Sequence, residues 1–144
     1  MPWREKSNMI NSLIEVLKVE LKELNELLIL LDKQYKLIIN KDVFGMESLV
    51  EEIKLKNRTV AESEVNRRKV LGKESIKDII LSSKNEELED VYRKIQKLLN
   101  EMILQKDTND LLIKQQLSFT NKLLNLINPK RDIPIYNSYG NIRR

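Results

Sequence analysis

Nine apolar or aromatic residues in the first third of the chain repeat on a strict alternation of four and three positions. A 3.5-residue period held over about four heptads predicts one long helix, from about residue 6 to 39, whose seam faces a partner helix. Further apolar residues widen the seam, so we expect this helix to contact more than one neighbour. The seam residues are Ile10, Ile14, Leu17, Leu21, Leu24, Leu28, Leu31, Tyr35 and Ile38, and the widening residues are Leu13, Leu27, Leu30 and Ile39.

A second helix is predicted over about residues 43–71, with Asp42 as its N-cap. Its seam is less apolar, because Asn57, Glu64 and Arg67 stand at core-like positions. Two interpretations are open: these residues lie at the edge of the bundle, or they fix helix register as single buried polar groups do. The edge is favoured, because charged side chains are rarely buried without a partner.

The remaining chain predicts a short helix and a long one. Gly72 is typical of the position just after a helix, and Ser75 resembles the start of a capping box for a helix over about residues 75–82. The last helix spans about residues 86–127 and ends before Pro129. At about 1.5 Å per residue it is roughly 63 Å long. Because it is longer than either earlier helix, we expect part of it to extend past its neighbours and leave apolar residues without partners.

These elements predict an all-α protein, an elongated antiparallel bundle or coiled coil of three long helices plus one short helix. Residues 1–128 form the helical bundle. Residues 129–144 contain two prolines, no helical period and four basic residues against one acidic residue, which predicts a flexible basic tail.

Composition excludes the commonest kinds of catalytic and metal site. The chain has no Cys, no His and three Gly, so it lacks thiolate nucleophiles, imidazole bases, sulfur-bound zinc and glycine-rich phosphate loops. Adjacent carboxylates such as Glu51 and Glu52 lie beside lysines, which is typical of solvated helix surfaces. We therefore expect no enzyme activity, no catalytic residue, no metal and no cofactor.

Charge and hydropathy bear on location and partners. No uncharged apolar stretch reaches about 18 residues, which indicates no membrane insertion, and the first residues lack the pattern of a secretory signal. A cytoplasmic location is expected. The net charge is +4, and most of the excess lies in residues 129–144 rather than on one helix face. Nucleic acid is therefore not an expected partner, although the basic tail keeps it as a distant third hypothesis.

Two segments carry apolar residues that the bundle does not obviously need. The end of the last helix is dense in them, and an unpartnered apolar strip there would be a binding surface or an oligomer interface. The tail holds Tyr136 and Tyr139 among isoleucines, and docking on the bundle and contact with a partner are equally plausible for it.

Taken together, the chain resembles the FlgN family of flagellar export chaperones over nearly its whole length. The resemblance rests on the leucine-rich first helix, the loop with Asp42, the second helix ending in Arg67-Arg68, and the short capped helix. Its more specific segments are Asn109-Asp110-Leu111-Leu112 and Ile135-Tyr136-Asn137-Ser138-Tyr139-Gly140.

The resemblance implies a cytoplasmic, non-enzymatic chaperone. Such proteins bind the hook-associated proteins of the hook–filament junction, prevent their premature association and deliver them to the flagellar type III export apparatus. In the family the C-terminal part contacts the client. The candidate client-binding residues are then Asn109, Leu112, Phe119, Leu123, Leu126, Tyr136, Tyr139 and Gly140.

We expect a helix-in-groove contact in which the strip around Leu112, Phe119, Leu123 and Leu126 covers an amphipathic terminal helix of the client. The alternative is a homo-oligomeric structural coiled-coil or adaptor protein, whose strip pairs with itself in a homodimer.

Overall fold

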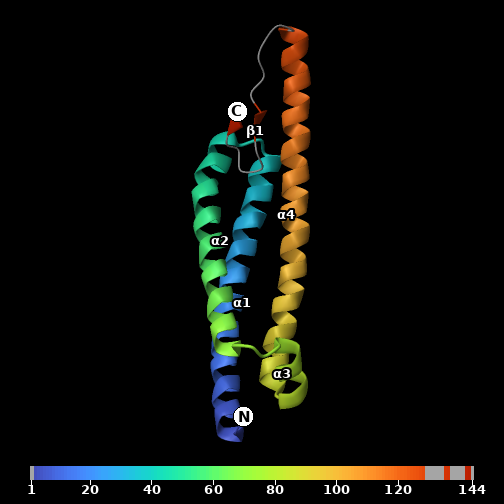
Figure 1. Cartoon of the computed structure of the whole chain (residues 1–144). Helices are drawn as coiled ribbons and strands as arrows, with labels where there is room; N and C mark the ends of the chain where they lie inside the picture. The colour runs from blue at the N-terminus through green and yellow to red at the C-terminus, as the bar shows by residue number, and fades with distance from the viewer. Residues whose placement is uncertain (1, 129–134, 137–141, 144) are drawn as a thin grey trace.

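The chain forms an elongated, mainly helical rod in a computed structural model that describes residues 2–128, 135–136 and 142–143 (Figure 1). Its helices are α1 (Trp3–Ile39), α2 (Val43–Leu71), α3 (Ile76–Ser83) and α4 (Glu86–Ile127). The expected bundle of three long helices and one short helix is therefore confirmed. α1 begins three residues earlier than the expected position 6, directly after Pro2, which caps it without a side-chain hydrogen bond.

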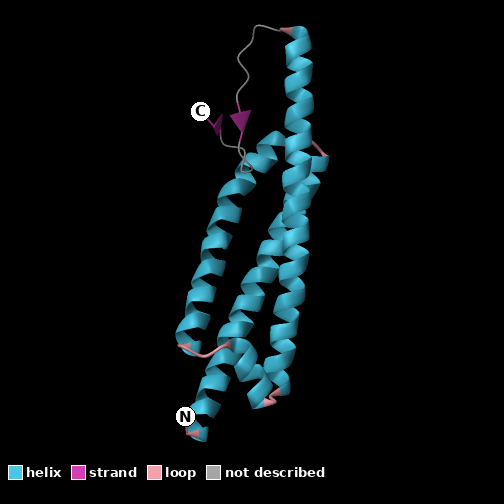
Figure 2. Ribbon diagram, turned by 45° about the vertical axis from the view of Figure 1, so that its right-hand side comes forward, coloured by secondary structure: helices cyan, strands magenta, loops and turns pink. Residues whose placement is uncertain are grey.

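α1 is the central helix, since it packs along both α2 and α4. The expectation of more than one neighbour is thus confirmed. α2 runs back along α1, α3 turns the chain at the lower end, and α4 then runs in the same direction as α1 (Figures 1 and 2). α4 projects beyond the turn that joins α1 to α2.

The core follows the broadened seam of α1. Leu13 and Leu27, which widen the predicted seam, are buried, while Leu21 and Leu28 of the strict seam are half-buried. One helix face therefore serves two neighbours, which requires a wider apolar arc than a single coiled-coil seam. The buried residues of α4 that face it are Leu88, Val91, Ile95, Leu98 and Asn109.

The helix ends follow local sequence signals with one exception. The Asp42 carboxylate accepts a hydrogen bond from Gly45 N at 2.9 Å, which confirms it as the N-cap of α2. Gly72 ends α2 at φ 62°, a conformation that glycine adopts without steric cost. Ser75 does precede α3, but its side chain makes no capping hydrogen bond among the described residues. Asn85 caps α4 by accepting a hydrogen bond from Leu88 N at 3.0 Å, a role not predicted.

The three polar residues at core-like positions of α2 do not all follow the same interpretation. Asn57 is exposed and Glu64 half-buried, as the edge interpretation expects. Arg67 instead donates from Nη1 to Oε1 of Glu20 at 2.8 Å, and the Glu20 side chain is only 2% exposed. Burial raises the pKa of the Glu20 carboxyl above its ordinary value. The nearby positive charge of Arg67 lowers that pKa, and the negative charge of Glu64 raises it. Arg67 therefore pairs a charge inside the α1–α2 interface rather than lying at its edge.

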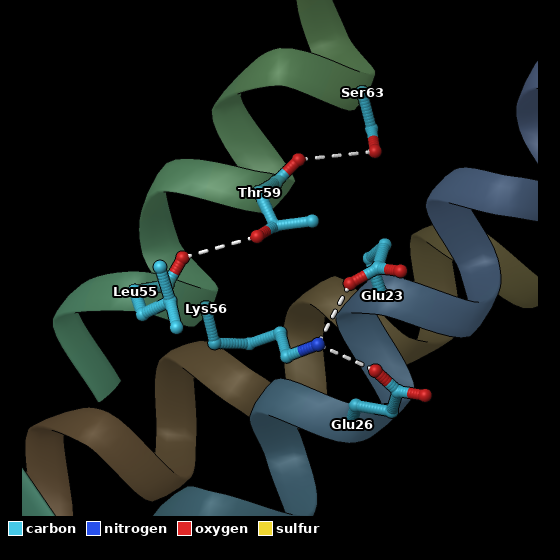
Figure 3. Close-up of polar contacts among 6 residues, drawn as sticks. All are labelled: Glu23, Glu26, Leu55, Lys56, Thr59 and Ser63. Atoms are coloured by element: carbon cyan, nitrogen blue, oxygen red, sulfur yellow. Dashed lines mark hydrogen bonds and ion pairs between the residues drawn. The ribbon is translucent and has the colours of Figure 1, made fainter. Parts of the chain in front are cut away.

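A second ionic contact joins the same two helices. Lys56 of α2 reaches between two carboxylates of α1, and its Nζ donates to Glu23 at 2.8 Å and to Glu26 at 2.5 Å (Figure 3). These hydrogen bonds raise the pKa of Lys56, and the bond from Lys56 lowers the pKa of Glu26. The contact pairs α1 and α2 across the outer edge of their interface.

The predicted tail contributes two short strands to the described structure. β1 (Ile135–Tyr136) pairs antiparallel with β2 (Ile142–Arg143), so that Tyr136 lies opposite Ile142. This pairing was not predicted. The predicted flexibility concerns residues 129–134, 137–141 and 144, which lie outside the described residues.

Candidate functional site

The end of α4 projects past the helix it packs against. Asn109 and Gln116, one heptad apart, donate to the backbone carbonyls of Leu31 and Ile38, which are also one heptad apart, at 2.8 and 2.9 Å. α4 is thus held beside α1 in one constant register up to Gln116. Because α1 ends at Ile39, residues 117–127 of α4 have no part of α1 beside them (Figure 1). We call this segment the overhang, and at about 1.5 Å per residue it is roughly 16 Å long.

The apolar strip predicted on α4, which comprises Leu112, Phe119, Leu123 and Leu126, lies mostly on this overhang. Leu112 is half-buried, whereas Phe119 is 66%, Leu123 47% and Leu126 82% exposed. At about 100° per residue these side chains fall on one side of the helix and continue the face that packs on α1 lower down. Phe119, Leu123 and Leu126 are therefore exposed apolar side chains at the projecting end of α4.

Asn109, the first of the predicted contact residues, lies in the core instead of on the surface. Its side chain is fully buried; Nδ2 donates to Leu31 O and to Gln34 Oε1, and Oδ1 accepts from Gln105 at 2.9 Å. Every polar atom of the amide has a partner. The structure therefore places Asn109 where it fixes the register of α4 against α1, below the overhang.

The predicted residues of the tail are only partly described. Tyr136 lies in β1, and Tyr139 and Gly140 lie outside the described residues. β1 and β2 lie near the α1–α2 turn in both views (Figures 1 and 2).

The α1–α2 turn adds exposed apolar residues that the sequence analysis did not assign to a binding surface, and Ile39, expected there to widen the seam of the first helix, is one of them. Ile39 and Val43 are about half exposed and Phe44 is 84% exposed. The turn lies beside the foot of the overhang, because Gln116 bonds to Ile38, the residue before Ile39. A Cβ on Gly45 would approach Asp42 Oδ2 to 2.7 Å, so a glycine permits this tight turn. The sequence signal that could have identified this surface is the presence of apolar residues shortly before and directly after Asp42, a recognisable N-cap.

The described residues expose apolar surface at the upper end of the molecule. Within them, no group of three or more His, Cys, Asp or Glu side chains is arranged to hold a metal ion. Across the same part of the chain, no helix is both long and apolar enough to cross a membrane. What the upper end of the molecule can do is bury apolar surface against a partner.

Comparison with known proteins gives one match. A protein-family model described as "FlgN protein" matches residues 9–144, essentially the whole chain. No curated protein and no solved structure matches significantly.

Proposed function

Since this chain belongs to the FlgN family, the flagellar export chaperones, we propose that it binds hook-associated proteins through the apolar strip on α4. By covering the surfaces through which these clients associate, it keeps them apart in the cytoplasm until they reach the flagellar export apparatus. Components of that apparatus are its second class of partner. The work is done by binding alone, without a catalytic step or cofactor.

One observation carries the proposal: three large apolar side chains stand in solvent on a helix that projects beyond its own bundle. They are Phe119, Leu123 and Leu126. Burying a fully exposed Leu or Phe is worth about 1.5–3 kcal/mol, and these three are exposed to about two thirds on average, so together they supply roughly 3–6 kcal/mol before the costs of association. We therefore expect burial of these three side chains to be the largest single contribution to the affinity for one client helix.

The mode of recognition follows from the spacing. Phe119, Leu123 and Leu126 stand at intervals of four and three, the spacing with which one helix packs on another. An amphipathic terminal helix of the client would lie against them in the place that α1 occupies lower down. Leu112, half-buried at the foot of the overhang, would close the lower end of the contact.

The other predicted contact residues have different parts in the proposal. Tyr136, Tyr139 and Gly140 are proposed as a second client contact on the strength of the sequence alone. Asn109 would act indirectly, because its hydrogen bonds hold α4 at the height from which the overhang projects.

The test is a binding measurement on the full chain. A triple variant, Phe119→Ser, Leu123→Ser and Leu126→Ser, is titrated calorimetrically with a peptide of the C-terminal helix of a hook-associated protein from the same organism. The control carries serine at Ile29, Leu55 and Leu104, which are similarly exposed on other surfaces. We expect the triple variant to lose at least about 100-fold in affinity, which is about 2.7 kcal/mol, and the control to stay within about threefold. Far-UV circular dichroism checks that both remain helical, and an unchanged affinity would contradict the proposal.

The alternative, a homo-oligomeric structural or adaptor protein, predicts a different result in light scattering. A monomer that gains mass only with the client peptide supports the chaperone function. A stable homodimer that ignores the peptide would mean that the strip pairs with itself, and it would overturn the proposal.

A further inference from the structure

The overhang is not exposed evenly around its circumference. Leu117, Asn121 and Leu124 are half-buried, and the other eight of its residues are exposed. The three half-buried residues stand at intervals of four and three, so they form one stripe along the helix. We call them the covered stripe. At about 100° per residue it lies roughly 160° around α4 from the exposed part of the apolar strip. The overhang is therefore covered on one side and open on nearly the opposite side.

The long helices do not account for the upper part of the covered stripe. α1 ends at Ile39 and α2 begins at Val43, and the last described hydrogen bond between α4 and α1 is made by Gln116. Asn121 and Leu124 lie roughly 8 and 12 Å further along α4. Both neighbouring helices stop below them (Figure 1). Another part of the chain or a partner has to supply the cover.

The overhang also needs support because its sequence favours a helix only weakly. Five of its eleven residues have low helix propensity, namely Ser118, Phe119, Thr120, Asn121 and Asn125. Most helical stability in proteins comes from packing of one face rather than from propensity. A projecting helix end of this composition frays unless something packs on it.

The pair of strands β1 and β2 needs a packing surface of its own. Each strand has two residues, and an isolated two-stranded sheet is marginally stable at best in water. Tyr136 lies opposite Ile142, so their side chains share one face of the sheet. Both strands lie near the α1–α2 turn, well below the upper end of α4 (Figures 1 and 2). An apolar face that needs cover is thus near the foot of the overhang.

The chain between α4 and β1 is long enough for this arrangement. Seven residues, 128–134, join Ile127 to Ile135. At about 3.3 Å per residue they reach roughly 23 Å, whereas the overhang is roughly 16 Å long. The connection from the upper end of α4 to β1 is therefore little longer than the overhang itself.

We propose that the tail, residues 129–144, packs on the covered stripe and keeps the overhang helical, with the Tyr136–Ile142 face of the sheet at the foot near Leu117. The strip on the other side stays open, so the tail and a client helix do not exclude each other. A client that also contacts the tail reaches its outer face. An overhang held as a helix before binding has less conformational freedom to lose when a partner binds.

The test measures amide hydrogen exchange of the overhang by NMR in the full chain. One double variant, Tyr136→Ser and Ile142→Ser, changes the tail, and another, Leu117→Ser and Leu124→Ser, changes the covered stripe. We expect each to accelerate exchange of the amides of residues 119–127 at least about fivefold, because opening of the helix end becomes easier. Combining all four changes should add less than about twofold, because both pairs remove the same contact.

The matched control is the double variant Leu123→Ser and Leu126→Ser, which lowers the helix propensity of the overhang equally but on its open side. It should accelerate the same amides by less than about threefold. Unchanged exchange in the tail variant, or fully additive effects of the two pairs, would overturn the proposal. So would exchange that slows as protein concentration rises, which would assign the cover to a second copy of the chain.

This test uses no client, so its outcome is separate from that of the proposed function. A tail that does not protect the overhang leaves the strip available for a hook-associated protein. A tail that does protect it keeps that role even if the client proves to be a different protein.

Discussion

At the scale of single residues, Glu20 is the least satisfied group in the described core. Its Oε1 accepts from Arg67, but its buried Oε2 has no hydrogen-bond partner among the described residues. Burial raises the pKa of this carboxyl above its ordinary value of 4.5, so the folded protein binds the proton more tightly than the unfolded chain does. Its contribution to stability is therefore complete below pH 4.5 and is lost as pH rises through the folded pKa.

Replacing Glu20 with Gln should remove that pH dependence. The free energy of unfolding of the native protein, taken relative to Glu20→Gln, should be constant below pH 4.5 and fall as pH rises toward neutrality. Urea denaturation at a series of pH values, followed by circular dichroism, measures the difference. A difference that instead grows with pH would mean that the ion pair with Arg67 outweighs the cost of burial.

Asn109 makes the opposite case, a buried polar group with every partner in place. Asn109→Ala should lower the free energy of unfolding by about 2–3 kcal/mol, because it leaves a cavity and unpairs the amides of Gln34 and Gln105. Thermal and urea denaturation check this. Asn100→Ala, at an exposed position of the same helix, should stay within about 0.5 kcal/mol. A change at Asn109 no larger than the control would contradict a structural role.

These residues show which details a sequence can predict. Asp42 and Gly72 act through contacts within a few residues, so their roles as helix-end signals were predictable. The Asn109 partner Leu31 lies 78 residues away, and a seam pattern does not say which carbonyl will stand opposite a given amide. Asn109 was therefore assigned to the candidate binding surface from resemblance, while its burial depends on the register between two distant helices.

At the scale of elements, the α1–α2 pair combines an apolar seam with one ion pair inside the interface, Arg67 with Glu20, and a second ionic contact, that of Lys56, at its edge. The hydrogen bond from Lys56 holds the pKa of Glu26 below its ordinary value of 4.5. The stability contributed by this contact is thus present above pH 4.5 and lost as pH falls through the folded pKa. Because this contact is partly exposed, it contributes little to the free energy of unfolding, and its main effect is on which faces of α1 and α2 pack together.

Lys56→Met should return the pKa of Glu26 toward 4.5, because the hydrogen bond that lowers it disappears. A carbon-detected NMR titration of the glutamate carboxyl groups measures the shift. Lys54→Met on the same helix, which removes a lysine that lies 3.8 Å from Glu51, should leave Glu26 unchanged. An unshifted Glu26 in Lys56→Met would contradict the pairing.

At the scale of the whole molecule, one end is packed and the other is open. Buried residues lie between Leu13 and Asn109 in sequence, and no described residue after Asn109 is buried. The rod and its projecting helix were predictable, because helix length follows from the extent of a periodic pattern. The central place of α1 and the parallel direction of α4 were not predictable. An apolar seam shows that a helix packs on another, but it does not show which helices pair or in which register.

This division predicts that the open end contributes little to folding. A chain ending after Gln116 keeps both side-chain contacts that fix α4 on α1, and the side chains it loses among residues 117–128 are at most half-buried. We expect it to unfold cooperatively with a free energy of unfolding lower by no more than about 2 kcal/mol, the worth of one or two partly covered leucines. Urea denaturation monitored by circular dichroism measures this.

A chain ending after Gln105 is the matched comparison, because it removes eleven further residues and with them Asn109 and Gln116. Its free energy of unfolding should fall clearly further than that of the chain ending after Gln116, because Gln34 loses its hydrogen-bond partner and the upper core around Leu31 becomes exposed to water. If the chain ending after Gln116 were as unstable as this one, the overhang would have to be packed against something in solution. It could not then be a free surface for a client. If only the shorter chain unfolds, the molecule consists of a self-sufficient bundle that carries a projecting helix free to bind.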